Sequence, residues 1–205
     1  MRNRKIGCVI LPGIWVLLVF LAILAYKNMW GFSRQVSDRE KTIRLEVVDT
    51  AESWLGANEK DGSHQKIIDI YNSHMPLARD YPVTYEDAWC SAFVSTVAIQ
   101  CGLTDIIPTE CGCDCQIDLL CGIDAWAEAD DYVPLPGDLI FYHWECQSVG
   151  ESDHWSDHVG IVVGTLGPLI KVIEGNKDND VSYRITMVDA PGIRGYGLPD
   201  YESKV

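Results

Sequence analysis

Three side chains that together can perform thiol chemistry follow one another along the sequence. Cys90 begins an apolar run, His158 begins a second one, and a third run ends in Glu174 and Asn176, which flank a glycine. Acyl transfer by a thiol needs a thiolate, an imidazole within hydrogen-bonding reach, and a polar group that fixes the orientation of the imidazole. The sequence offers all three in order, which makes Cys90 a candidate nucleophile.

Cys90 is expected in the first turn of a helix. The positive end of the helix dipole and the unpaired backbone N–H groups there favour a thiolate over a thiol. Asp87 is suited to cap this helix, which would place Cys90 at about the third helical position. A cysteine at the start of an apolar stripe is also compatible with a small core residue that has no chemistry.

His158 and Glu174 are expected to lie next to each other across two paired strands. In an antiparallel pair, the start of one strand lies beside the end of its neighbour, so the run 158–163 brings its first residue to the end of the run 169–174. Two simpler interpretations stay open here. They are an exposed histidine at a strand end, and a turn at 174–176 without chemistry.

The elements that must position these residues change from helices to strands along the chain. Residues 43–55 and 67–71 carry apolar side chains at helical spacing, and the helix near Cys90 is expected to end at Gly102. The later apolar runs are short and rich in β-branched and aromatic residues. These runs cover residues 138–144, 158–163, 169–174 and 181–186, whereas 111–126 is irregular. Helices followed by strands predict an α+β domain with an antiparallel sheet.

The N-terminal stretch 6–26 contains no charged side chain. At about 1.5 Å per residue, a helix of this length reaches about 30 Å, the thickness of a bilayer core. A cleaved secretory signal is the competing interpretation, with Ala25 as a weak cleavage residue. We expect an uncleaved membrane anchor at 1–27, a linker at 28–42 and a folded domain at 43–205.

The charge of the chain excludes one class of partner. The sequence has 16 basic and 30 acidic residues, which give a net charge of −14. Nucleic acids are bound mainly through Lys and Arg, so an acidic chain is a poor nucleic-acid binder. We therefore expect no nucleic-acid partner.

A cluster of four cysteines has no obvious role. Its members are Cys111, Cys113, Cys115 and Cys121. Zinc sites built from cysteine usually contain pairs separated by about two to four residues, and this alternating pattern differs from them. Disulfides, structural thiols and metal binding all stay open for the cluster. His154 and His158 would converge on a metal only within a helix, and their surroundings indicate a loop. We expect no metal site and no cofactor.

Four stretches of the sequence resemble the motifs of CHAP domains, a family of cysteine, histidine-dependent amidohydrolases and peptidases within the papain-like and NlpC/P60-like group. The stretches are residues 87–94 (DAWCSAFV), 136–142 (PGDLIFY), 157–162 (DHVGIV) and 173–176 (IEGN), and the similarity continues through 193–197 (IRGYG). The IEGN stretch favours CHAP over NlpC/P60 domains, which often use a second histidine as the third member of the site.

The resemblance implies Cys90 as nucleophile, His158 as general base and then acid, and Glu174 with Asn176 as the groups that orient or complete the site. It also implies helices packed on an antiparallel sheet, and amide bonds of bacterial peptidoglycan as substrate. With the predicted anchor, it places the catalytic domain on the extracytoplasmic face of a cell membrane. Two alternatives stay open: an inactive module of this fold that binds wall peptides, and a cysteine-rich surface protein that binds metal.

Overall fold

The computed structural model of the chain describes residues 30–129, 132–144 and 156–205. The chain divides into two compact units, Met1–Trp30 and Gly31–Val205, and the second is the folded domain described below. The predicted membrane segment 6–26 lies outside the described residues. Within the described ranges, no helix is long and apolar enough to cross a bilayer.

The α-helices of the domain precede the sheet in sequence. The first of them begins at Asp38, where the Ser37 hydroxyl caps it by accepting a hydrogen bond from the Glu40 backbone N–H (3.1 Å). This helix therefore starts inside the stretch 28–42 that the sequence assigned to a linker. The described helices are α2 (Asp38–Glu52), α3 (Gln65–Ser73), α4 (Cys90–Cys101) and α5 (Cys113–Gly122), with 3-10 turns at Ala78–Asp80 and Tyr201–Lys204.

The strands form one antiparallel sheet in the order β1-β6-β2-β3-β4-β5. Their bounds are β1 (Trp126–Glu128), β2 (Leu139–Tyr142), β3 (His158–Leu166), β4 (Leu169–Lys177), β5 (Asp180–Met187) and β6 (Ile193–Gly197). The predicted α+β class with an antiparallel sheet is confirmed. The neighbours β3, β4 and β5 follow one another along the chain, so two hairpins build this half of the sheet.

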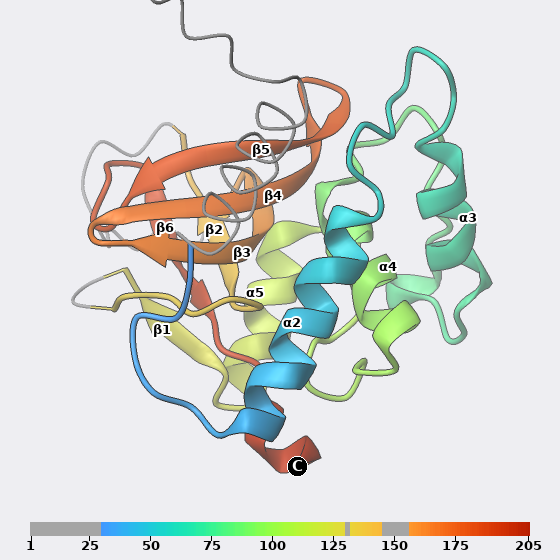
Figure 1. Ribbon diagram of the computed structural model, residues 1–205. Helices are drawn as coiled ribbons and strands as arrows, with labels where there is room; N and C mark the ends of the chain where they lie inside the picture. The colour runs from blue at the N-terminus through green and yellow to red at the C-terminus, as the bar shows by residue number, and fades with distance from the viewer. Residues whose placement is uncertain (1–29, 130–131, 145–155) are drawn as a thin grey trace, which may run out of the picture. The chain divides into compact units, whose positions relative to one another are not determined.

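The helices gather on one face of the sheet (Figure 1), and α4 packs against both β3 and β4. Side chains of β2 alternate between the two faces: Leu139 and Phe141 join the core under the helices, whereas Ile140 and Tyr142 join a smaller cluster on the opposite face. Both faces of this strand are therefore buried.

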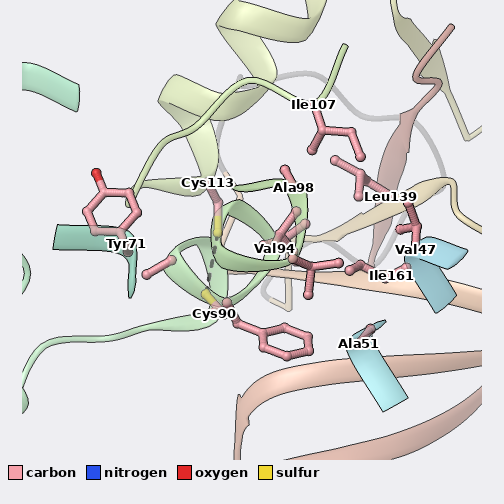
Figure 2. Packing of buried hydrophobic residues seen from close by; sticks show 14 of the residues in the cluster. Val47, Ala51, Tyr71, Cys90, Val94, Ala98, Ile107, Cys113, Leu139 and Ile161 are labelled. Carbon is pink, nitrogen blue, oxygen red and sulfur yellow. Dashed lines mark hydrogen bonds between the residues drawn. The ribbon is translucent and has the colours of Figure 1, made fainter. Parts of the chain in front are cut away.

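Helix α4 is the centre of the main core. Its residues from Cys90 to Ala98 are all buried, because the helices α2 and α3 and the strands β3 and β4 all pack against α4. Figure 2 shows Val94 and Ala98 of this helix among side chains from α2 and the strands. The helix ends as predicted at Gly102, which adopts a left-handed conformation with φ of 67°. The core thus fixes the position of the N-terminal end of α4, where Cys90 lies.

Candidate active site

Cys90 is the first residue of α4. The N-cap is Trp89, and its side chain makes no capping hydrogen bond. The prediction that Asp87 caps the helix is wrong, because the Asp87 carboxylate accepts hydrogen bonds from the backbone N–H of Thr84 (2.7 Å) and the hydroxyl of Tyr81 (2.9 Å) instead. Cys90 is therefore closer to the helix start than predicted, among backbone N–H groups that lack partners inside the helix.

The Cys90 thiol faces a second thiol, that of Cys113. The two Sγ atoms are 3.7 Å apart and share a hydrogen bond, drawn as a dashed line in Figure 2. Cys113 is the first residue of α5, so each of the two thiols lies at the N-terminal end of a helix. Only 5% of Cys90 and 8% of Cys113 is exposed. The sequence predicted neither α5 nor this contact.

Buried hydrogen bonds hold the start of α5 against α4. The Ser91 hydroxyl donates to Gln116 Oε1 (2.8 Å), and Gln116 Nε2 donates to the Pro108 carbonyl (3.1 Å). The Ser95 hydroxyl donates to the carbonyl of Glu110 (2.7 Å) and accepts from its backbone N–H (2.8 Å). Because buried hydrogen bonds are costly to leave unmade, this network keeps the two helix ends together.

His158 begins β3, the strand against which α4 packs, and it lowers the pKa of the Cys90 thiol. Its Nε2 lies 3.2 Å from Oε2 of Glu174 on β4, and Glu174 is fully buried. This contact leaves Nδ1 as the nitrogen that can exchange a proton with the thiol. Gly160 makes the contact possible, since a Cβ atom there would lie 2.7 Å from Glu174 Cγ and 2.6 Å from Val172 Cγ1.

The second oxygen of Glu174 pairs with a residue that the sequence did not single out. Arg184 on β5 donates from Nε to Glu174 Oε1 (2.7 Å), and its guanidinium lies over the ring of Trp144, 4.8 Å from the centroid. A buried carboxylate needs such a partner, but no local pattern identifies which arginine supplies it. Arg184 thus fixes the carboxylate that in turn orients His158.

These contacts favour a charged form of the site. The pKa of Cys90 is held well below its ordinary value by the Cys113 hydrogen bond, against the effect of burial, and then by His158. Burial lowers the pKa of His158, but Cys90 and Glu174 outweigh it and raise that pKa to about 9. Burial raises the pKa of Glu174, yet His158 and Arg184 hold it below the ordinary value.

Cys113 remains a thiol in this arrangement. Its hydrogen bond to Cys90 is the largest cause that raises the Cys113 pKa well above the ordinary value, and burial acts in the same direction. These shifts favour a Cys90 thiolate beside a His158 imidazolium. Cys113 donates its S–H to the thiolate, and the Glu174 carboxylate binds the imidazolium.

Asn176 lies apart from these contacts. It occupies the irregularity in the β4–β5 pairing between Glu174 and Lys177, with φ of 57° and a half-buried side chain. Among the described residues, no hydrogen bond joins its side chain to Cys90, His158 or Glu174. Its role in the site stays a prediction.

The cysteine cluster 111–121 contains free thiols. Cys111, Cys113, Cys115 and Cys121 are all unpaired, and Cys111 accepts a hydrogen bond from Arg79 Nη2 (3.2 Å). No group of three or more metal-ligating side chains gathers anywhere in the described part of the chain. His154 lies outside the described residues.

Comparison of the chain with protein-family models, with curated proteins and with solved structures found no match.

Proposed function

We propose that this protein is a cysteine hydrolase of the CHAP type, with a papain-like arrangement of helices on its sheet, that cleaves an amide bond in bacterial peptidoglycan. The observation that carries the chemistry is the buried contact between Glu174 and His158 (3.2 Å), together with the thiol at the start of α4, whose pKa His158 lowers. The motif resemblance supports the choice of substrate. With the predicted anchor 6–26, the domain would face the cell wall from the outer side of the membrane.

The first half of the reaction uses the charged pair. The Cys90 thiolate attacks the carbonyl carbon of the amide, and backbone N–H groups at the start of α4 stabilise the negative charge on the oxygen. His158, as an imidazolium, gives its proton to the leaving nitrogen. The C–N bond breaks, an amine leaves, and Cys90 carries a thioester.

The second half of the reaction releases the acyl group. His158, now neutral, takes a proton from a water molecule that attacks the thioester carbonyl. The C–S bond breaks, a carboxylic acid leaves, and the thiolate–imidazolium pair forms again. Glu174 keeps the imidazole in one orientation during both steps, and Arg184 and the closely packed strands hold Glu174.

The test is mass spectrometry of fragments released from purified peptidoglycan by the full chain in detergent. A matched pair of variants separates the nucleophile from other thiols: Cys90→Ala removes it, whereas Cys101→Ala changes a cysteine at the far end of the same helix. We expect fragments from the wild type and from C101A, and none from C90A. Free lactyl groups would identify cleavage next to the glycan, and new peptide amino termini would identify cleavage within the peptides.

Equal release by C90A and the wild type would overturn the proposal. If no variant releases fragments but the wild type sediments with the wall, the binding-module alternative would replace it. A thiol-directed label provides a check that needs no substrate, because a thiolate at Cys90 should react faster near neutral pH than the other thiols.

A further inference from the structure

We propose that Cys113 is a resolving thiol for Cys90, so that oxidation of Cys90 by a hydroperoxide ends in a reversible Cys90–Cys113 disulfide. The pair is a modification site in its own right. Only its consequence, a reversible block of hydrolysis, rests on the proposed function.

The position of the two sulfurs is the first argument. They are 3.7 Å apart, and a disulfide bond is about 2.0 Å long, so closure requires a movement of less than about 2 Å. Both thiols are free and almost fully buried. Figure 2 shows the two sulfurs directed toward each other from the ends of α4 and α5, with no side chain drawn between them.

The selectivity of the pair is the second argument. The hydrogen bonds from Ser91 to Gln116 and from Ser95 to Glu110 keep the start of α5 at this position. Two other described thiols have different partners. Cys111 accepts a hydrogen bond from Arg79, and Cys101 donates to Thr50 Oγ1 (3.3 Å).

The reactivity of the two thiols is the third argument. Cys90, as the thiolate, is the group that a hydroperoxide oxidises first. Cys113 is held as a thiol chiefly by its hydrogen bond to Cys90. When Cys90 becomes a neutral sulfenic acid, its negative charge disappears, and the deprotonation of Cys113 becomes easier.

The reaction is balanced with a hydroperoxide as oxidant. In the first step the Cys90 sulfur attacks the hydroperoxide, an S–O bond forms, the O–O bond breaks, and the alcohol, or water from hydrogen peroxide, leaves with a proton from His158. In the second step the Cys113 sulfur attacks the Cys90 sulfur, an S–S bond forms, the S–O bond breaks, and the Cys113 proton leaves with the hydroxyl as water. A dithiol reverses the outcome by thiol–disulfide exchange.

The experiment treats the reduced full chain in detergent with hydrogen peroxide, blocks the remaining thiols with N-ethylmaleimide, and maps the digested peptides by mass spectrometry. In the wild type we expect a linked peptide pair that contains residues 90 and 113 and lacks two hydrogen atoms. Dithiothreitol should then restore most of the iodoacetamide labelling of Cys90.

Two matched variants make the result specific. C113S retains a hydrogen-bond donor of similar size but cannot form the disulfide. In C113S we expect Cys90 to gain two oxygen atoms as a sulfinic acid, with labelling that dithiothreitol does not restore. C101S removes a thiol of the same helix and should behave as the wild type.

Sulfinic acid at Cys90 of the wild type without the 90–113 link would overturn the proposal. A link from Cys90 to Cys111 or Cys115 in place of Cys113 would also overturn it. The mapping needs no peptidoglycan, so the disulfide can be found in a protein that hydrolyses nothing, and hydrolysis can be found in a protein that forms no disulfide. The experiments can therefore refute the disulfide proposal and the hydrolase proposal independently of each other.

Discussion

Replacing Glu174 with glutamine tests whether the carboxylate maintains the charged site. Glutamine has nearly the same shape, so E174Q removes the negative charge with little change in packing. The charge serves two cations, since Oε2 faces His158 (3.2 Å) and Oε1 accepts from Arg184 (2.7 Å). In the variant the Arg184 guanidinium remains nearby and has lost its counter-charge. Both effects disfavour the protonated form of His158.

The size of the effect follows from the pKa of His158. The folded protein raises this pKa from an ordinary value near 6.5 to about 9, which corresponds to about 3 kcal/mol in favour of the imidazolium. Cys90 and Glu174 both contribute against the cost of burial. A hydrogen bond to a charged group contributes about 1.5–3 kcal/mol. We therefore expect E174Q to reduce the proton affinity of His158 by about tenfold or more.

The direction of the pH dependence follows from the same shift. In the wild type the imidazolium persists until the pH rises through about 9. In E174Q it should lose its proton at a lower pH, so the alkaline limb of the activity profile moves toward neutrality. A tenfold loss of proton affinity moves the His158 midpoint from about 9 to about 8, so about half of the molecules should lack the proton that the leaving amine needs at pH 8, and hydrolysis there should fall by about twofold or more.

The assay is an NMR titration of the imidazole carbon-bound protons in the wild type and E174Q, with the His158 signal assigned from its loss in H158N. E59Q is the matched control. Glu59 accepts a hydrogen bond from Trp89 beside the start of α4 and makes no described contact with His158. An unchanged His158 midpoint in E174Q, or an equal decrease in E59Q, would refute the reasoning.

Two further predictions concern packing around the site. Gly175→Ala should destabilise the domain by about 1–3 kcal/mol, because the new Cβ would lie 2.6 Å from Cγ of the buried Phe93. Thermal unfolding followed by circular dichroism checks this against Gly122→Ala, where no heavy atom lies within 4 Å; equal melting temperatures would contradict it. Asp138→Ala should lower the free energy of unfolding by about 3–5 kcal/mol, because the buried carboxylate accepts hydrogen bonds from Arg44 (2.7 Å), the Tyr132 hydroxyl (2.6 Å) and the Leu135 backbone N–H (2.8 Å), and Arg44 would keep only Glu40 as a charged partner. Urea unfolding measures this loss, and a change below about 1 kcal/mol would show that the pair does not stabilise the fold.

The local pattern of apolar and β-branched residues was sufficient to predict most of the helices and strands. The helical spacing before residue 102 and the short β-branched runs after residue 138 correspond to α2–α4 and β2–β5. Helix α5 was missed although its buried residues have helical spacing, because one of them, Gln116, is a polar residue of a type that is mostly exposed in folded proteins. Strand β1 is three residues long and, among the described strands, pairs only with β6. A strand this short carries too little alternation to be recognised alone.

The sequence by itself determined the candidate nucleophile and its two partners. Cys90 begins an apolar helical run, His158 begins β3, and Glu174 lies on the neighbouring antiparallel strand β4, so the spacing of apolar residues along the chain was enough to propose each of them. Only the tertiary structure decided that Cys113 faces the nucleophile and that Arg184 balances the buried carboxylate. These contacts join separate elements, and they depend on how a helix and a strand pack after both have formed. The spacing of apolar residues along the sequence does not predict such contacts between elements, because they result from the packing of the whole core.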